Sequence, residues 1–275
     1  MVRTLIQRTY RFYRKYMALL KMGWAIVIAY RSEAFIWMIG SFFQPLVSLF
    51  VWMSIAGDGT VGGYSTADFV LYFVGVLVVG RMTGAWDIWH LDNDIRQGTF
   101  SNKLLRPFHP VHWNMADNLA SKLFWLLLIV PVWTVLALIF PGLRPPISPL
   151  FYLYTFISMM LALLIRFIIG YQIGMLAFWT NRAASIYVVY EGIHLFMSGR
   201  IAPLSMFPSW VISLAEWLPF YITVGFPVEM LSGQLTDPVL IGKYFGLQCI
   251  WLTVLILLFR LEWKWGIRKY SAVGG

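Results

Sequence analysis

Hydrophobic and polar positions alternate along this chain in long blocks. Each long apolar block is close to the roughly 20 residues that a helix needs to cross a hydrocarbon core. Six such blocks are present, and the predicted spans are residues 34–56, 68–90, 119–141, 149–178, 183–204 and 239–260. The pattern predicts an all-α integral membrane protein that forms one transmembrane domain over residues 1–275.

The first 31 residues have a different pattern, with apolar side chains at spacings of three and four and basic side chains between them. At 100° per residue the two sets lie on opposite sides of a helix. The apolar set is Ile6, Tyr10, Tyr13, Met17, Leu20 and Trp24, and the basic set is Arg8, Arg11 and Lys15. We expect an amphipathic elbow helix over residues 1–31 that lies in the headgroup region, and not a cleavable signal peptide.

Residues 205–237, between the fifth and sixth spans, contain several prolines. The apolar runs at 210–215 and 217–226 are too short to cross a membrane and too apolar for a solvated loop. We therefore predict one or two short re-entrant helices on the outer side of the membrane.

The longest polar interruption covers residues 92–118 and follows the second span. Its first ten residues can continue that span as a helix into water, and Gly98 can break the helix. Apolar side chains next to basic ones are typical of a protein-contact patch. The predicted patch consists of Arg96, Phe100, Lys103, Leu104, Leu105 and Arg106. The alternative is a helix that lies against the first spans of the same chain.

Composition excludes a soluble domain, because only 12% of residues are charged and 60% are hydrophobic. The net charge of +9 comes from basic residues at the ends of apolar segments, which indicates membrane orientation and not nucleic-acid binding. With the N-terminus inside, the inner flanks hold 16 of the 21 Lys and Arg residues. The outer side holds Arg144 and Arg200, with Lys243 near the outer end of the last span. Both termini and the 92–118 loop are therefore predicted to be cytoplasmic.

Catalytic and nucleotide-binding motifs are missing from the sequence. It has one cysteine, Cys249, four scattered histidines and no GxxxxGK[ST] loop. The run Leu231-Ser232-Gly233-Gln234 lacks one glycine of the LSGGQ signature of ABC ATPases, so we interpret it as a coincidence. We expect no catalytic residue, metal site or cofactor in this chain.

Several ionisable residues fall inside the predicted spans, where each charge costs roughly 2.5–3.5 kcal/mol to insert. Two interpretations remain open. One is an interhelical pair that serves packing, for example between Arg166 and Glu191. The other is a polar substrate path, whose candidate residues are Arg81, Arg166, Glu191 and His194. Asp87 is expected near the cytoplasmic interface, where it needs no partner.

Residues 95–107 resemble the "I-R-x-G-x-x-x-x-x-L-L-R-P" loop of the six-span permease subunits of ABC exporters that carry polysaccharides, drugs and lipids. The fold of that family is similar to the ABCG-like (type V) transporters. The outer region resembles the same family at Gly199, Pro203, Phe207, Pro208, Trp210, Leu218, Pro219, Phe220 and Pro227.

The resemblance implies a permease that forms a dimer, with a second copy or a homologous permease, and binds a separate cytoplasmic ATPase that holds ATP and Mg. The loop after the second span would couple the two subunits. The matching residues are Ile95, Arg96, Gly98, Phe100, Lys103, Leu104, Leu105 and Arg106. In this hypothesis ATP hydrolysis moves the loop and rocks the second span. Two alternatives remain: a membrane enzyme that uses Arg166, Glu191 and His194 on a lipid-linked substrate, and a passive channel or scaffold.

Overall fold

The computed structural model describes residues 2–139, 145 and 147–271, without the side chains of residues 2–6, 8, 9, 11 and 136. The helices are α1 Val2–Ala29, α2 Arg31–Ala56, α3 Thr66–Thr83, α4 Asp87–Arg96, α5 Phe100–Leu104, α6 Pro110–Ile139, α7 Pro149–Met175, α8 Ala183–Met197, α9 Ser209–Trp217, α10 Gly225–Ser232 and α11 Pro238–Lys269. Short 3-10 helices cover Leu176–Phe178 (η2), Leu204–Met206 (η3) and Tyr221–Thr223 (η4), and strands β1 Thr60–Val61 and β2 Tyr64–Ser65 form a hairpin.

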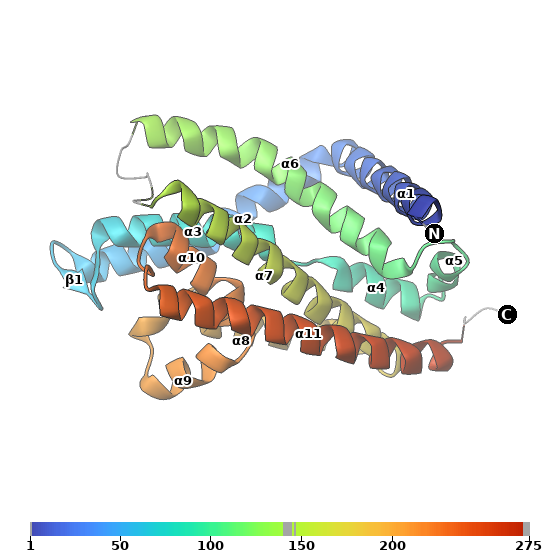
Figure 1. Cartoon of the computed structure of the whole chain (residues 1–275). Coiled ribbons are helices and arrows are strands. Elements are labelled where there is room, and N and C mark those ends of the chain that lie inside the picture. The colour runs from blue at the N-terminus through green and yellow to red at the C-terminus, as the bar shows by residue number, and fades with distance from the viewer. Residues whose placement is uncertain (1, 140–144, 146, 272–275) are drawn as a thin grey trace.

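The long helices form a bundle whose two ends differ (Figure 1). The beginning of α1, helix α5 and the end of α11 lie at one end, and the β-hairpin and α9 lie at the other. Five helical segments of the described chain are long and apolar enough to cross a membrane: Arg31–Ala56, Thr66–Arg96, Pro110–Ile139, Pro149–Phe178 and Pro238–Lys269. The chain is therefore an all-α, multi-pass membrane protein.

Helix boundaries agree with the sequence prediction for the first and fourth spans. The sixth span begins where it was predicted, but α11 continues to Lys269, beyond the predicted end at residue 260. The third span begins at Pro110 rather than residue 119, because its polar residues Asn114, Asn118 and Lys122 are buried inside the protein instead of lying in a loop. Its predicted end at residue 141 lies outside the described residues, as does Arg144.

The fifth predicted span, 183–204, is wrong in its length. Helix α8 has 15 residues and ends at Met197. At 1.5 Å per residue it is about 22 Å long, which is shorter than the roughly 30 Å hydrocarbon core. The chain turns at Gly199, whose φ of 86° favours glycine. The Tyr72 hydroxyl of α3 donates to the Gly199 carbonyl oxygen at 2.7 Å and holds this turn.

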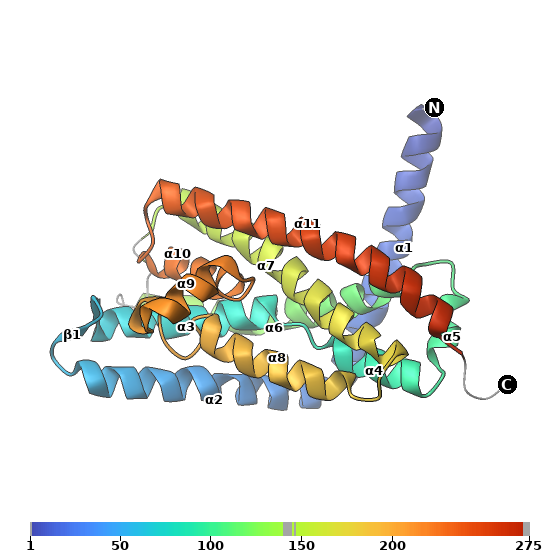
Figure 2. The ribbon, with the colours of Figure 1, turned by 90° about the horizontal axis from the view of Figure 1, so that it is seen from below.

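Helix α1 packs on α6, where Trp24 of the predicted apolar set contacts Phe124. Phe12 and Tyr16 contact Phe108, and Leu19 is buried, whereas Tyr10 and Tyr13 are exposed. The side chains of Ile6, Arg8 and Arg11, which belong to the predicted apolar and basic faces, are outside the described part of the structure. The first part of α1 projects sideways from the bundle (Figure 2).

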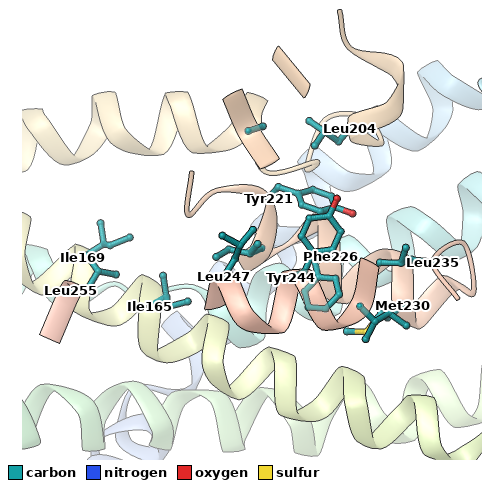
Figure 3. Packing of buried hydrophobic residues seen from close by; sticks show 13 residues of the cluster. Ile165, Ile169, Leu204, Tyr221, Phe226, Met230, Leu235, Tyr244, Leu247 and Leu255 are labelled. Carbon is teal, nitrogen blue, oxygen red and sulfur yellow. The ribbon is translucent and has the colours of Figure 1, made fainter. Parts of the chain in front are cut away.

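The segment predicted to be re-entrant contains two short helices, α9 and α10. The largest buried apolar cluster joins this region to α7 and α11, with the rings of Tyr221, Phe226 and Tyr244 close together (Figure 3). The amide of Gln248, on α11, donates to the Ile222 carbonyl oxygen at 2.8 Å. Gly233 ends α10 in the left-handed conformation at φ 79°, so the run that resembles the ATPase signature is a helix cap.

Candidate functional site

The second span is broken inside the bundle. Helix α3 ends at Thr83 and α4 begins at Asp87, so the predicted continuous span 68–90 is wrong at this point. A break frees backbone groups that must find new partners away from water. The Lys122 ammonium donates to the Gly84 carbonyl oxygen, and the Tyr187 hydroxyl donates to the Ala85 carbonyl oxygen at 2.7 Å. Side chains from α6 and α8 therefore stabilise the break.

Asn118 connects the charges at this break. Its side-chain oxygen accepts a hydrogen bond from Lys122, and its amide nitrogen donates to Asp87 Oδ2 at 2.9 Å. Asp87 is buried, so it does not lie in water at the interface as the sequence suggested. The positive charge of Lys122 and the negative charge of Asp87 offset each other, and the neutral side chain of Asn118 bridges them.

A second charged group lies next to the break. Arg166 Nη2 is 2.8 Å from Glu191 Oε1, which confirms the predicted pair. Arg200 Nη1 is 3.1 Å from Glu191 Oε2, so one carboxylate binds two guanidinium groups. Arg200 was predicted to lie on the outer side and was not among the predicted path residues. The turn at Gly199 is what brings Arg200 back to Glu191.

These side chains line a pocket of about 270 Å³. Its walls are formed by Gly80, Gly84, Ala85, Trp86, Trp89, Arg166, Tyr187, Val188, Glu191 and Arg200. The sequence predicted Arg166 and Glu191 as path residues, and both are in the wall. Arg81 lies beside the pocket, with its guanidinium 5.7 Å from the centre of the Trp86 ring.

His194 does not belong to this pocket. It is fully buried, and its Nε2 is 3.0 Å from Thr223 Oγ1 of η4. The sequence alternative of a membrane enzyme needs His194, Glu191 and Arg166 to converge on one substrate. Because His194 bonds to Thr223 and does not line the pocket with Arg166 and Glu191, the described residues do not place the three side chains around one pocket.

The segment after α4, residues 97–109, is the second candidate site. Gly98 has a φ of 75° and turns the chain between α4 and α5. Phe100 was predicted to be exposed in the contact patch, but it is fully buried. Its ring packs on Phe178 and Trp263, with centroid distances of 5.9 and 6.1 Å. Phe100 is therefore a core residue that anchors α5, and Ile95 is buried as well.

Other side chains of the predicted patch do reach the surface. Leu105 is 87% exposed, and Arg96 and Arg106 are also exposed. Leu104 is half-buried and packs against the cluster around Phe100. The Lys103 ammonium lies 2.6 Å from Asp94 Oδ2. The surface that remains for a partner thus consists mainly of Arg96, Leu105 and Arg106.

The end of α11 holds this segment in place. The Tyr270 hydroxyl accepts from the Ser101 backbone N–H at 3.1 Å and donates to the Gly98 carbonyl oxygen at 2.8 Å. The Tyr270 ring also packs on Phe100. The sequence alternative placed this helix against the first spans, whereas it lies against the last helix and η2.

Comparison with known proteins adds one match. The family described as "ABC-2 family transporter protein" matches residues 35–274. The match covers the elements from α2 to α11, including the broken second span, the pocket and the 97–109 segment. A comparison with curated proteins gives no match.

Proposed function

The chain belongs to the ABC-2 family of transporter proteins, and on this premise we propose that it is the permease subunit of an ATP-driven exporter in the cell (inner) membrane. Permeases of this family work with ATPase subunits. ATP and Mg belong to that partner in our proposal, and the chain itself has no enzymatic activity.

The 97–109 segment is the proposed coupling site for the ATPase. The observation that carries this proposal is the 87% exposure of Leu105 at the end of a short helix that is otherwise anchored by buried Phe100. An exposed apolar residue next to a basic one, Arg106, suits a protein contact. The count of basic residues supports a cytoplasmic location for this end of the bundle, together with both termini.

Motion of the coupling segment has two routes into the membrane. The sequence suggested rocking of the second span, through α4. The contacts of Phe100 and Tyr270 support a second route, through Phe178 and α11. We propose that both routes are used, because α5 contacts α4 as well as Phe178 of η2 and Trp263 of α11.

Leu105→Asp tests the coupling proposal. The side chain packs little within the chain, so folding should survive while capture of the ATPase and ATP-driven transport are lost. The matched control is Val239→Asp, which changes a 78% exposed side chain at the start of α11, at the other end of the bundle. Normal ATPase capture by Leu105→Asp would contradict the proposal.

A dimer is the proposed assembly, formed with a second copy or a homologous permease. Helix α2 has a row of exposed apolar side chains, including Ile36, Phe43 and Phe50, and α8 exposes Val188 and Phe196. These surfaces contact lipid or a second permease. Because the chain has one cysteine, a Cys249→Ser background with Val188→Cys allows a disulfide crosslinking test, and absence of crosslinked dimers in membranes would argue against this surface.

The remaining parts of the proposal concern the membrane surface. The sideways projection of α1 supports an elbow helix in the inner headgroup region. The shortness of α9 and α10 supports a re-entrant position on the outer side. Fluorescence quenching by lipids that carry a quencher at a known depth, with a probe at position 13 or 210, tests both positions.

A further inference from the structure

We infer that the pocket at the break of the second span binds an anionic group, such as a phosphate or carboxylate, of an amphiphilic transported molecule. This inference rests on the proposed transport function and adds a substrate class to it. The relevant features are the balance of charge in the pocket, its aromatic wall and its size.

Positive charge exceeds negative charge around the pocket. Arg166 and Arg200 share the single carboxylate of Glu191, at 2.8 and 3.1 Å. Arg81 adds a third guanidinium, and in the described part of the chain no carboxylate lies within ion-pair distance of it. A charge in a membrane interior is costly unless it is paired. An anionic ligand would supply the missing partner.

The chemistry of the cations favours an oxyanion. A guanidinium presents several N–H donors in a planar fork that matches a carboxylate or phosphate group. Glu191 uses only part of the donors of Arg200, which is 24% exposed at the pocket. Arg166 is 5% exposed, and its ion pair holds Glu191 in position. Arg200 is therefore the residue that can contact a ligand directly.

The neighbouring wall suits an apolar or flat group. Trp86 and Trp89 line the same pocket and are 53% and 44% exposed. Exposed tryptophans offer a large apolar face to a ligand. The pocket volume of about 270 Å³ lies just below the range of roughly 300–1,000 Å³ for small-molecule sites, so it holds one group of a larger molecule. The ligand class is thus an amphiphile with an anionic head.

The test measures equilibrium binding of radiolabelled dodecyl phosphate to the permease–ATPase complex in nanodiscs of zwitterionic lipid, after subtraction of empty nanodiscs. Dodecyltrimethylammonium is the matched cationic probe. We expect the wild type to prefer the phosphate, and Arg200→Gln to weaken its binding at least about tenfold, since a hydrogen bond to a charged group is lost. Lys243→Gln, which removes the same charge from the ion pair with Glu216, should leave binding unchanged.

Arg200→Gln leaves the Arg166–Glu191 pair intact, and its thermal unfolding midpoint reports whether the fold is preserved. If this variant misfolds, the preference of the wild type for dodecyl phosphate over the cationic probe still tests the inference. Equal binding of both probes, stronger binding of the cationic probe, or unchanged phosphate binding in folded Arg200→Gln would overturn the inference. The titration is repeated with the permease alone. This result does not depend on ATPase capture, so failure of the anion-site inference can be distinguished from failure of the proposed coupling.

Nanodiscs that contain anionic phosphatidylglycerol identify the source of the anion. If a membrane lipid headgroup fills the pocket, this lipid competes with dodecyl phosphate in the wild type, and the competition disappears in Arg200→Gln. If the site takes the cargo and not the bulk lipid, phosphatidylglycerol has no effect on the measured affinity. Both outcomes support an anion site and assign it to different molecules.

Discussion

Tyr270→Phe removes a hydroxyl, directly after α11, that hydrogen-bonds to the proposed coupling segment. The substitution deletes two hydrogen bonds, from the Ser101 N–H at 3.1 Å and to the Gly98 carbonyl oxygen at 2.8 Å. The ring remains, so its contacts with Phe100 and Phe178, at centroid distances of 5.7 and 5.9 Å, are preserved. The change therefore tests the hydrogen bonds separately from the packing.

Each hydrogen bond contributes about 1 kcal/mol net, so the local opening free energy of the segment should fall by about 2 kcal/mol. Since about 1.4 kcal/mol corresponds to a factor of ten, exchange of the Ser101 amide should become roughly 25-fold faster. Global stability should change less, because the buried rings stay in contact.

Hydrogen exchange followed by mass spectrometry of peptides that cover residues 97–105 measures this effect in the assembled complex. ATP-driven transport should fall together with protection, since a loosened α5 passes less motion to α11. Tyr30→Phe is the matched control, because Tyr30 is 64% exposed at the junction of α1 and α2. Unchanged exchange at Ser101 would refute the reasoning, and faster exchange with normal transport would refute the second route of coupling.

Three further perturbations have outcomes that the contacts determine. Gly266→Ala places a Cβ too close to the Phe178 ring and should cost about 1–3 kcal/mol in unfolding experiments. Gly242→Ala in the same helix meets nothing within 4 Å and should be neutral or stabilising. Glu191→Gln leaves two arginines without their carboxylate and should lower the unfolding free energy by about 3 kcal/mol, a loss that Glu191→Asp should partly restore. Burial lowers the pKa of His109, so the folded state favours its neutral form. Its stabilising contribution is present above about pH 6.5 and is lost as the pH falls through the lower folded pKa, and thermal unfolding of His109→Gln should depend less on pH in that range.

Long apolar blocks could be located from the sequence because each must satisfy a length requirement set by the bilayer. The fourth span, 149–178, coincides with α7 and η2, and the helical nature of residues 2–29 was predicted as well. The break at residues 84–86 could not be found in this way. No proline marks it, and its free carbonyl groups are stabilised by Lys122 and Tyr187, which are distant in sequence.

The features that could be predicted from the sequence differ between the two candidate sites. The turn at Gly98 and the exposed Leu105 follow from local composition, but the burial of Phe100 depends on aromatic rings of η2 and α11. In the pocket, the Arg166–Glu191 pair follows from the cost of unpaired charges in a membrane. The role of Arg200 depends on the turn at Gly199, which places it beside Glu191.

The sequence by itself determined that this chain is an all-α membrane protein with a polar segment after its second span, because hydrophobic length and charge distribution act locally along the chain. Only the tertiary structure decided which polar groups meet. Side chains that are far apart in sequence pair inside the bundle because buried charges and freed carbonyl groups require partners wherever the packed helices provide them. That requirement joins α3, α4, α7 and α8 around one pocket.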